Sequence, residues 1–146
     1  MIASGVSCVL LGERHHGLSD GIRGLLDSEF DMVVMVADET SLMEGSRRLQ
    51  PSLAVADLSM FREPNLGWIG RLRADNPKLR VIVLSIHDEP SVCRTAMEAG
   101  ADGYVLKRDI ATDLLPAVTA ALAGQRYVSA GALDQSTPNG PPFHYR

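Results

Sequence analysis

The sequence predicts an α/β domain with a doubly wound parallel sheet of five strands, each followed by a helix. Short runs rich in Val, Leu and Ile alternate along the chain with segments whose apolar residues recur every three or four positions. The apolar runs show little alternation with polar residues, as is typical of strands buried on both faces. Five such units in 146 residues fit one domain with right-handed crossovers and helices on both faces of the sheet.

The predicted strands share a short apolar run that ends at polar residues. In chain order they are Ser7–Leu11, Asp31–Val36, Leu53–Asp57, Arg80–Ser85 and Gly103–Lys107. After each predicted strand, apolar residues recur at the spacing of one helix face. In the last predicted helix these residues are Ile110, Leu114, Leu115, Val118 and Leu122. Gly100 and Gly124 are placed as helix stops, and Ser91 and Asp109 are placed as N-caps.

Composition excludes several classes of protein. A net charge of −4 argues against a sequence-neutral nucleic-acid surface, and no apolar run approaches the ~20 residues that span a bilayer. Cys8 and Cys93 lie far apart in regular elements, which favours two buried thiols in a cytoplasmic protein. The composition changes after Ser129, so we expect one domain over residues 1–129 and a flexible tail or linker remnant over residues 130–146.

Asp57 is the most informative residue of the chain. It ends an apolar run, and open α/β sheets place their ligand sites at the carboxyl edge of such strands. Three other predicted strands also end in polar residues. Glu13 and Arg14 come after the first strand, Ser85 ends the fourth and Lys107 ends the fifth. An acid, a hydroxyl and a lysine beside one carboxylate predict a site for a phosphoryl group on Asp57.

Three stretches resemble the response-regulator receiver domain, the phosphoacceptor module of two-component signalling. They are PSLAVADLSM at residues 51–60, VIVLSIHD at 81–88 and AMEAGADGYVLK at 96–107. The similarity is closest to the NarL/FixJ subfamily, which is usually joined to a LuxR-type helix-turn-helix, and it covers about residues 7–129. The resemblance implies a flavodoxin-like sheet of strand order 2-1-3-4-5. It also implies a cytoplasmic signalling protein that is not an enzyme and whose partner is a histidine kinase or another signalling protein.

The resemblance also implies residue roles. Asp57 would accept the phosphoryl group, and Glu13 and Asp57 would hold Mg²⁺ together with the backbone carbonyl of Ser59. The remaining family positions are Ser85 and Lys107, which would contact phosphoryl oxygens, and Tyr104, which would be the aromatic switch residue.

Two departures from the family pattern surround this site. The family has two adjacent acids where this chain has Glu13 and Arg14, and a guanidinium cannot ligate Mg²⁺. We favour an atypical receiver in which Arg14 pairs with Asp57 or Glu13 and Mg²⁺ binding is weak or absent. The alternative is that Arg14 turns to solvent and Glu13 suffices for a weak metal site. Phe61 replaces the usual proline, and the usual turn is displaced to residues 64–67, where Asn65 could take a positive φ.

Other functions fit the residues less well. A conventional receiver cut from a LuxR-type DNA-binding regulator remains open. A flavodoxin-like redox protein would need small residues where the loop at 12–17 carries Glu, Arg and two His. We expect no direct nucleic-acid binding and no membrane association, whereas a homodimer through the last helix is plausible from its apolar residues. His15, His16 and His87 do not follow a zinc spacing, and we expect surface or loop roles for them.

Overall fold

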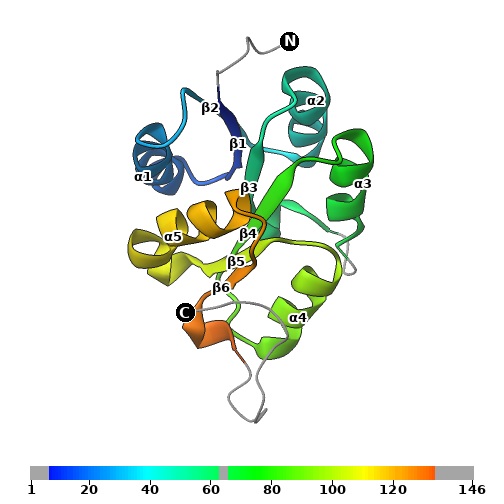
Figure 1. The fold of residues 1–146 in the computed structure, drawn as a ribbon. Coiled ribbons are helices and arrows are strands. Elements are labelled where there is room, and N and C mark those ends of the chain that lie inside the picture. The colour runs from blue at the N-terminus through cyan, green and yellow to red at the C-terminus, as the bar shows by residue number, and fades with distance from the viewer. Residues whose placement is uncertain (1–6, 63–65, 134–146) are drawn as a thin grey trace.

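The computed structural model describes residues 7–62 and 66–133 and contains one parallel sheet (Figure 1). Its strands are β1 Cys8–Gly12, β2 Met32–Val36, β3 Leu53–Asp57, β4 Arg80–Ser85, β5 Gly103–Leu106 and β6 Tyr127–Val128. They lie in the order β2-β1-β3-β4-β5-β6, and every neighbouring pair is parallel. The doubly wound fold and the order 2-1-3-4-5 are therefore confirmed, and β6 adds a sixth strand that was not predicted.

Helices cover both faces of the sheet. The helices are α1 His16–Asp27, α2 Glu39–Leu49, α3 Gly67–Asp75, α4 Pro90–Glu98 and α5 Ile110–Leu122. In Figure 1, α1 and α5 lie on one side of the sheet, and α2, α3 and α4 lie on the other. Each central strand therefore has an apolar layer on both faces, which is why the sequence shows continuous apolar runs rather than alternation.

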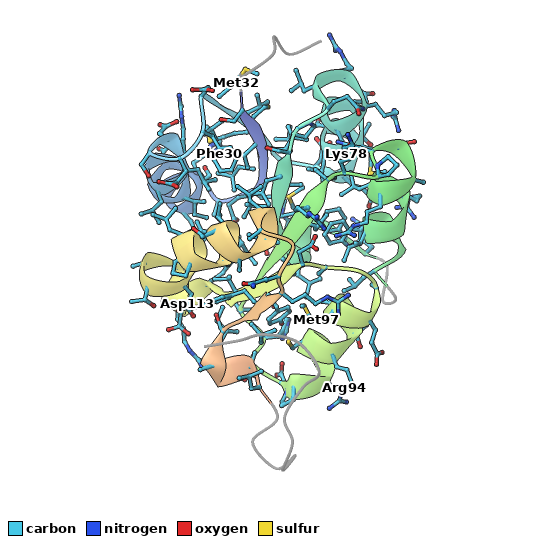
Figure 2. The ribbon with its side chains drawn as sticks, viewed as in Figure 1. Phe30, Met32, Lys78, Arg94, Met97 and Asp113 are labelled. Carbon is cyan, nitrogen blue, oxygen red and sulfur yellow. The ribbon has the colours of Figure 1, made fainter. Side chains whose placement is uncertain are left out.

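Successive residues of the strands enter different cores. Leu10 packs in the core that α2, α3 and α4 cover, whereas its neighbour Leu11 packs in the core that α1 and α5 cover. Figure 2 shows Met97 between α4 and the sheet and Phe30 beside α1, while Arg94 on the outer side of α4 is exposed. The loops at the carboxyl ends of the strands are thus held between two fixed helical layers.

Helix boundaries follow local backbone chemistry. Gly100 and Gly124 take φ values of +113° and +80° just after α4 and α5, as expected for glycine stops. The predicted N-cap Ser91 is wrong, because α4 begins one residue earlier at Pro90 with Glu89 as its N-cap. Leu66 takes a φ of +56° before α3, while Pro64 and the expected turn residue Asn65 lie outside the described residues.

The chain after α5 returns to the sheet. Tyr127 and Val128 pair with β5, and the Ser129 hydroxyl accepts from Leu106 N at 3.1 Å and donates to Asp113 Oδ2 at 2.8 Å. A short 3-10 helix follows at Ala130–Ala132, and Leu133 is buried. The packed body therefore continues past the boundary expected at residue 129, and residues 134–146 of the expected tail lie outside the described part.

Helix α5 turns most of its apolar residues toward the sheet. Leu114 and Val118 are buried and Leu115 is partly buried, whereas 47% of Leu122 is exposed. Helix α5 therefore exposes little apolar surface through which the expected homodimer could form. None of the described helices has both the length and the apolar composition needed to cross a bilayer.

Candidate functional site

Four strand ends place side chains at the carboxyl edge of the sheet. Glu13 follows β1, Asp57 ends β3, Ser85 ends β4 and Lys107 follows β5. Glu13, Asp57 and Ser85 are buried, and the Lys107 side chain is only 13% exposed. Since β1, β3, β4 and β5 are neighbours in the sheet, the fold brings these residues to one edge, as the sequence predicts.

Lys107 joins the two acidic residues. Its Nζ lies 2.7 Å from Asp57 Oδ2 and 3.0 Å from Glu13 Oε1. The side chains of the two acids are 2% and 0% exposed, so each carboxylate has given up most of its contact with water. A buried carboxylate needs a compensating charge, and the ammonium group supplies it to both acids at once.

The charges of this cluster shift the pKa values of its members. Burial raises the pKa of Asp57, but hydrogen bonds from Lys107 and Ser59 outweigh burial, so the pKa falls below the usual 3.8. Burial likewise lowers the pKa of Lys107, and its bonds to Asp57 and Glu13 reverse the effect, so the pKa rises above 10.5. Asp57 and Lys107 are therefore both ionised across the neutral pH range.

Ser59 contacts Asp57 more closely than the sequence suggests. Its backbone N–H donates to Asp57 Oδ1 at 3.0 Å, and its hydroxyl donates to Asp57 Oδ2 at 2.7 Å. Asp57 thereby caps the 3-10 turn Leu58–Met60. The role expected for the Ser59 carbonyl toward a metal stays a prediction. The contact between Asp57 and Ser59 could have been predicted from the sequence, because an aspartate side chain often accepts a hydrogen bond from the residue two positions later.

Ser85 and Tyr104 hold the loop after β4. The Ser85 hydroxyl accepts from His87 N at 2.9 Å, and the Tyr104 hydroxyl donates to the carbonyl of His87 at 2.7 Å. Tyr104 is fully buried, and burial raises its pKa to about 12 although a hydrogen bond with Ser85 opposes the rise. The predicted phosphate contact and the predicted switch residue thus lie together and fix the same loop.

Arg14 is not paired with either acid in the described part of the chain. It is exposed, and within residues 7–62 and 66–133 it forms no ion pair and no side-chain hydrogen bond. The favoured expectation that Arg14 pairs with Asp57 or Glu13 is therefore wrong for this structure. A guanidinium loses strong hydration when it is buried, and Lys107 already neutralises both acids, so Arg14 gains little by turning inward.

The exposed position of Arg14 predicts a small effect on stability. Replacing it with alanine is expected to change the free energy of unfolding by less than about 0.5 kcal/mol, as is usual for surface substitutions. The denaturant midpoints of the two proteins measure this difference. A loss above about 1 kcal/mol would show that the guanidinium compensates the buried acids after all.

His15 lies exposed in the loop before α1, as expected, and it also contacts Glu13. Its Nδ1 lies 2.8 Å from Glu13 Oε2, and its backbone N–H donates to the same oxygen at 3.2 Å. One ligand atom from each of Glu13, His15 and Asp57 lies within 4.8 Å of the other two. The spacing in the sequence could have predicted this contact, because a residue two positions after Glu13 in a tight loop can fold back onto the Glu13 carboxylate.

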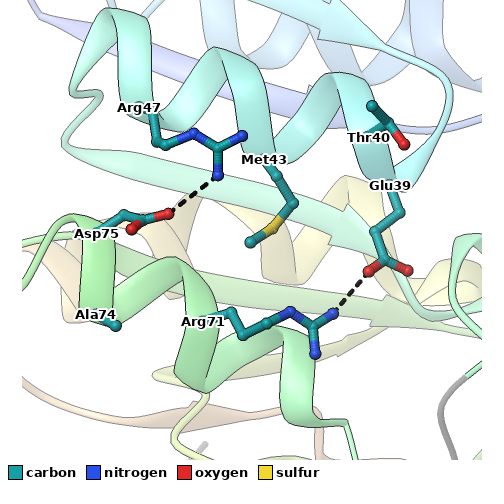
Figure 3. Close-up of a pocket in the computed structure, with 7 residues that line it drawn as sticks. All are labelled: Glu39, Thr40, Met43, Arg47, Arg71, Ala74 and Asp75. Atoms are coloured by element: carbon teal, nitrogen blue, oxygen red, sulfur yellow. Dashed lines mark hydrogen bonds and ion pairs between the residues drawn. The ribbon is translucent and has the colours of Figure 1, made fainter.

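A hollow separate from this site lies between α2 and α3. It has a volume of about 430 Å³. Arg47 pairs with Asp75 at 3.3 Å and Arg71 pairs with Glu39 at 2.6 Å, and Figure 3 shows both pairs. Met43 lies between the two pairs (Figure 3). The charged groups compensate one another across the helices, so this hollow offers a ligand no unbalanced charge, in contrast to the carboxyl edge.

Comparison with known proteins decides the family. The model of the response regulator receiver domain matches residues 9–119. The chain belongs to the response-regulator receiver family. This receiver is 31% identical over 131 residues to the transcriptional regulatory protein MctR of Rhizobium johnstonii, covering 86% of this chain and 60% of MctR. It is 30% identical over 123 residues to the nitrate/nitrite response regulator protein NarP of Escherichia coli, covering 83% of this chain and 57% of NarP.

Solved structures agree with this assignment. The non-phosphorylated receiver domain of RcsB from Escherichia coli superposes with a TM-score of 0.74 at 25% identity, covering 86% of this chain and 99% of that one. A LuxR-family response regulator from Aurantimonas sp. gives 0.75 at 25% identity, with coverages of 86% and 91%. The receiver spans about 60% of the length of these two curated relatives.

Proposed function

We propose that this chain is an atypical two-component receiver that accepts phosphate at Asp57 poorly with Mg²⁺ and signals in the cytoplasm through protein contacts. The observation that carries the proposal is the Lys107 ammonium, which lies within 3.0 Å of an oxygen of each acid. Glu13 Oε1 and Asp57 Oδ2 are thus neutralised without a metal ion. Since Lys107 stays charged at neutral pH, a hard cation must displace a bound charge before it can reach them.

The available donors fit Mg²⁺ poorly. Mg²⁺ demands near-ideal octahedral oxygen coordination, and the acid that the family has at position 14 is an exposed arginine here. Among the described histidine, cysteine and acidic side chains, the third group beside the two carboxylates is the nitrogen of His15. A positive side chain on the residue after Glu13 also repels an approaching cation, within roughly one Debye length of 8–10 Å.

The residues for phosphoryl transfer itself are nevertheless present. An Asp57 oxygen would be the nucleophile, while Ser85 at the end of β4 and Lys107 just after β5 would bind and neutralise the transferred group. This supports the second candidate, a conventional phospho-accepting receiver of a LuxR-type DNA-binding regulator. MctR is a transcriptional regulatory protein by name, which favours an output of that kind.

Restoring the second acid separates the two candidates. Arg14→Asp is expected to raise the initial rate of Mg²⁺-dependent labelling by a small phosphodonor at least about tenfold, equivalent to about 1.4 kcal/mol of metal affinity. Intact-protein mass measures the labelled fraction over time, and Asp57→Asn is the control that must stay unlabelled. Rapid, complete and Mg²⁺-dependent labelling of the unchanged protein would establish the conventional receiver instead.

Protein partners are part of the proposal. A histidine kinase or another signalling protein would dock beside the site, where Ile86 is 73% exposed on the loop that Tyr104 fixes. A homodimer would have to use the limited apolar surface at Leu122 on α5. No basic surface of the kind that binds nucleic acid is expected from a chain of net charge −4.

A further inference from the structure

We propose that Glu13, His15 and Asp57 form a site for a borderline transition-metal dication such as Zn²⁺, in preference to Mg²⁺. The inference rests on the proposed function, because it assigns a different ion to the pocket that we expect to bind Mg²⁺ poorly. The three ligand atoms lie within 4.8 Å of one another, with both carboxylates buried. Metal–ligand bonds near 2.0–2.2 Å place pairs of zinc ligands about 3–4 Å apart, so small side-chain movements suffice to close the group.

Lys107 and His15 use different oxygens of the same carboxylate. The ammonium lies 3.0 Å from Glu13 Oε1, whereas the imidazole Nδ1 lies 2.8 Å from Glu13 Oε2. The lysine likewise contacts Asp57 through Oδ2, while Oδ1 accepts from the Ser59 backbone. An ion on the His15 side can therefore bind Glu13 Oε2 while Lys107 keeps its contact with Oε1.

The charge and hydrogen bonding of Glu13 also favour a cation. Two carboxylates and one ammonium leave one negative charge in the buried cluster. The Glu13 side chain is 0% exposed, and the Lys107 ammonium at 3.0 Å is the only partner of its Oε1 among the described residues. A buried carboxylate with incomplete hydrogen bonding gains from a strongly charged ligand.

The donor set decides which ion is preferred. An imidazole nitrogen with two carboxylate oxygens suits Zn²⁺, Co²⁺ and Ni²⁺, whereas Mg²⁺ requires oxygen donors. Three protein ligands would leave a coordination position for water or for a ligand on the exposed side, where 66% of the His15 side chain meets solvent. The backbone bond from His15 N to Glu13 Oε2 fixes the loop that presents the imidazole.

Titration calorimetry of the full chain with Zn²⁺ alone and with Mg²⁺ alone tests the assignment. We expect one Zn²⁺ per chain at the site, with an affinity at least about a hundredfold above that for Mg²⁺. His15→Ala should lower the Zn²⁺ affinity at least about tenfold, since even losing the partner of a metal ligand typically costs that much. His16→Ala, next in sequence and exposed, is the matched control and should leave the affinity unchanged.

Paramagnetic Co²⁺ provides a second measurement that does not depend on affinity. Its broadening of imidazole resonances should be greatest for His15, and circular dichroism should show that the His15→Ala protein is folded. Unchanged Zn²⁺ binding in His15→Ala, broadening centred on another histidine, or no Zn²⁺ binding at all would overturn this inference and leave the proposed function standing. Tight Mg²⁺ binding by the unchanged protein would instead overturn the proposed function.

Discussion

Replacing Lys107 with methionine is expected to lower the free energy of unfolding at pH 7 by about 3–5 kcal/mol. Methionine keeps most of the volume of the side chain but removes the ammonium that lies between Asp57 and Glu13. Two buried carboxylates then face one another without a compensating charge. Breaking a buried ion pair in this way costs far more than removing an exposed one, because the remaining charges stay desolvated.

The stability difference should also depend on pH. In the unchanged protein the pKa of Asp57 is lowered, so its contribution is present above about pH 4 and is lost as the pH falls through the folded value. The pKa of Lys107 is raised, so its contribution is present below 10.5 and is lost as the pH rises through the folded value. Without the lysine, burial should raise the pKa of Asp57, so the variant should regain stability as the pH falls from 7 to 5.

Urea unfolding at pH 5 and at pH 7 measures both effects. Lys78→Met is the matched control, because Lys78 is exposed and is the other lysine of the chain. The control is expected to unfold like the unchanged protein at both values. A Lys107→Met protein within about 1 kcal/mol of the unchanged protein at pH 7 would mean that the acids are neutral or hydrated in the folded state.

Trp68→Ala is the second substitution with a large expected effect, again about 3–5 kcal/mol. The indole is fully buried in the core under α2, α3 and α4. Its ring also stacks on Phe61, with 3.8 Å between the ring centroids and 4° between the planes. Because Phe61 follows Asp57 by four residues, the loss should also loosen the loop that follows Asp57.

A double-mutant cycle isolates the stacking. Phe61→Ala alone should cost less than Trp68→Ala because Phe61 is only partly buried. The coupling between the two substitutions should be about 0.5–1.5 kcal/mol, the usual worth of an aromatic pair. Unfolding is followed by circular dichroism, since the variant has no tryptophan fluorescence. Additive effects would show that Phe61 covers the indole without stabilising it.

The sequence predicts the central strands well because their burial on both faces leaves an unbroken apolar run. The predicted and observed bounds of β3 and β4 agree at both ends. Strand β6 was not predicted, because two residues carry no periodic pattern, and its position depends on the edge of β5 and the Ser129 hydroxyl. Local composition therefore predicts the core of the sheet, whereas tertiary contacts decide what joins its edge.

The site was predicted less completely than the fold. Strand ends bring Glu13, Asp57, Ser85 and Lys107 to one edge, and that convergence follows from the topology of a parallel sheet. The directions of the loop side chains do not follow from topology. Arg14 and His15 are adjacent in sequence and both exposed, yet only His15 contacts Glu13, and this difference depends on desolvation and on the geometry of one tight loop.

The order of the strands has a consequence for handling the protein. Within the described sheet, the edge opposite β6 is β2, whose five residues Met32–Val36 are all apolar, and Met35 is 41% exposed. A free edge of this kind offers unpaired backbone N–H and C=O groups to any extended chain, and an apolar one invites aggregation. Protein concentration is therefore the variable to control when destabilised variants such as Lys107→Met are refolded.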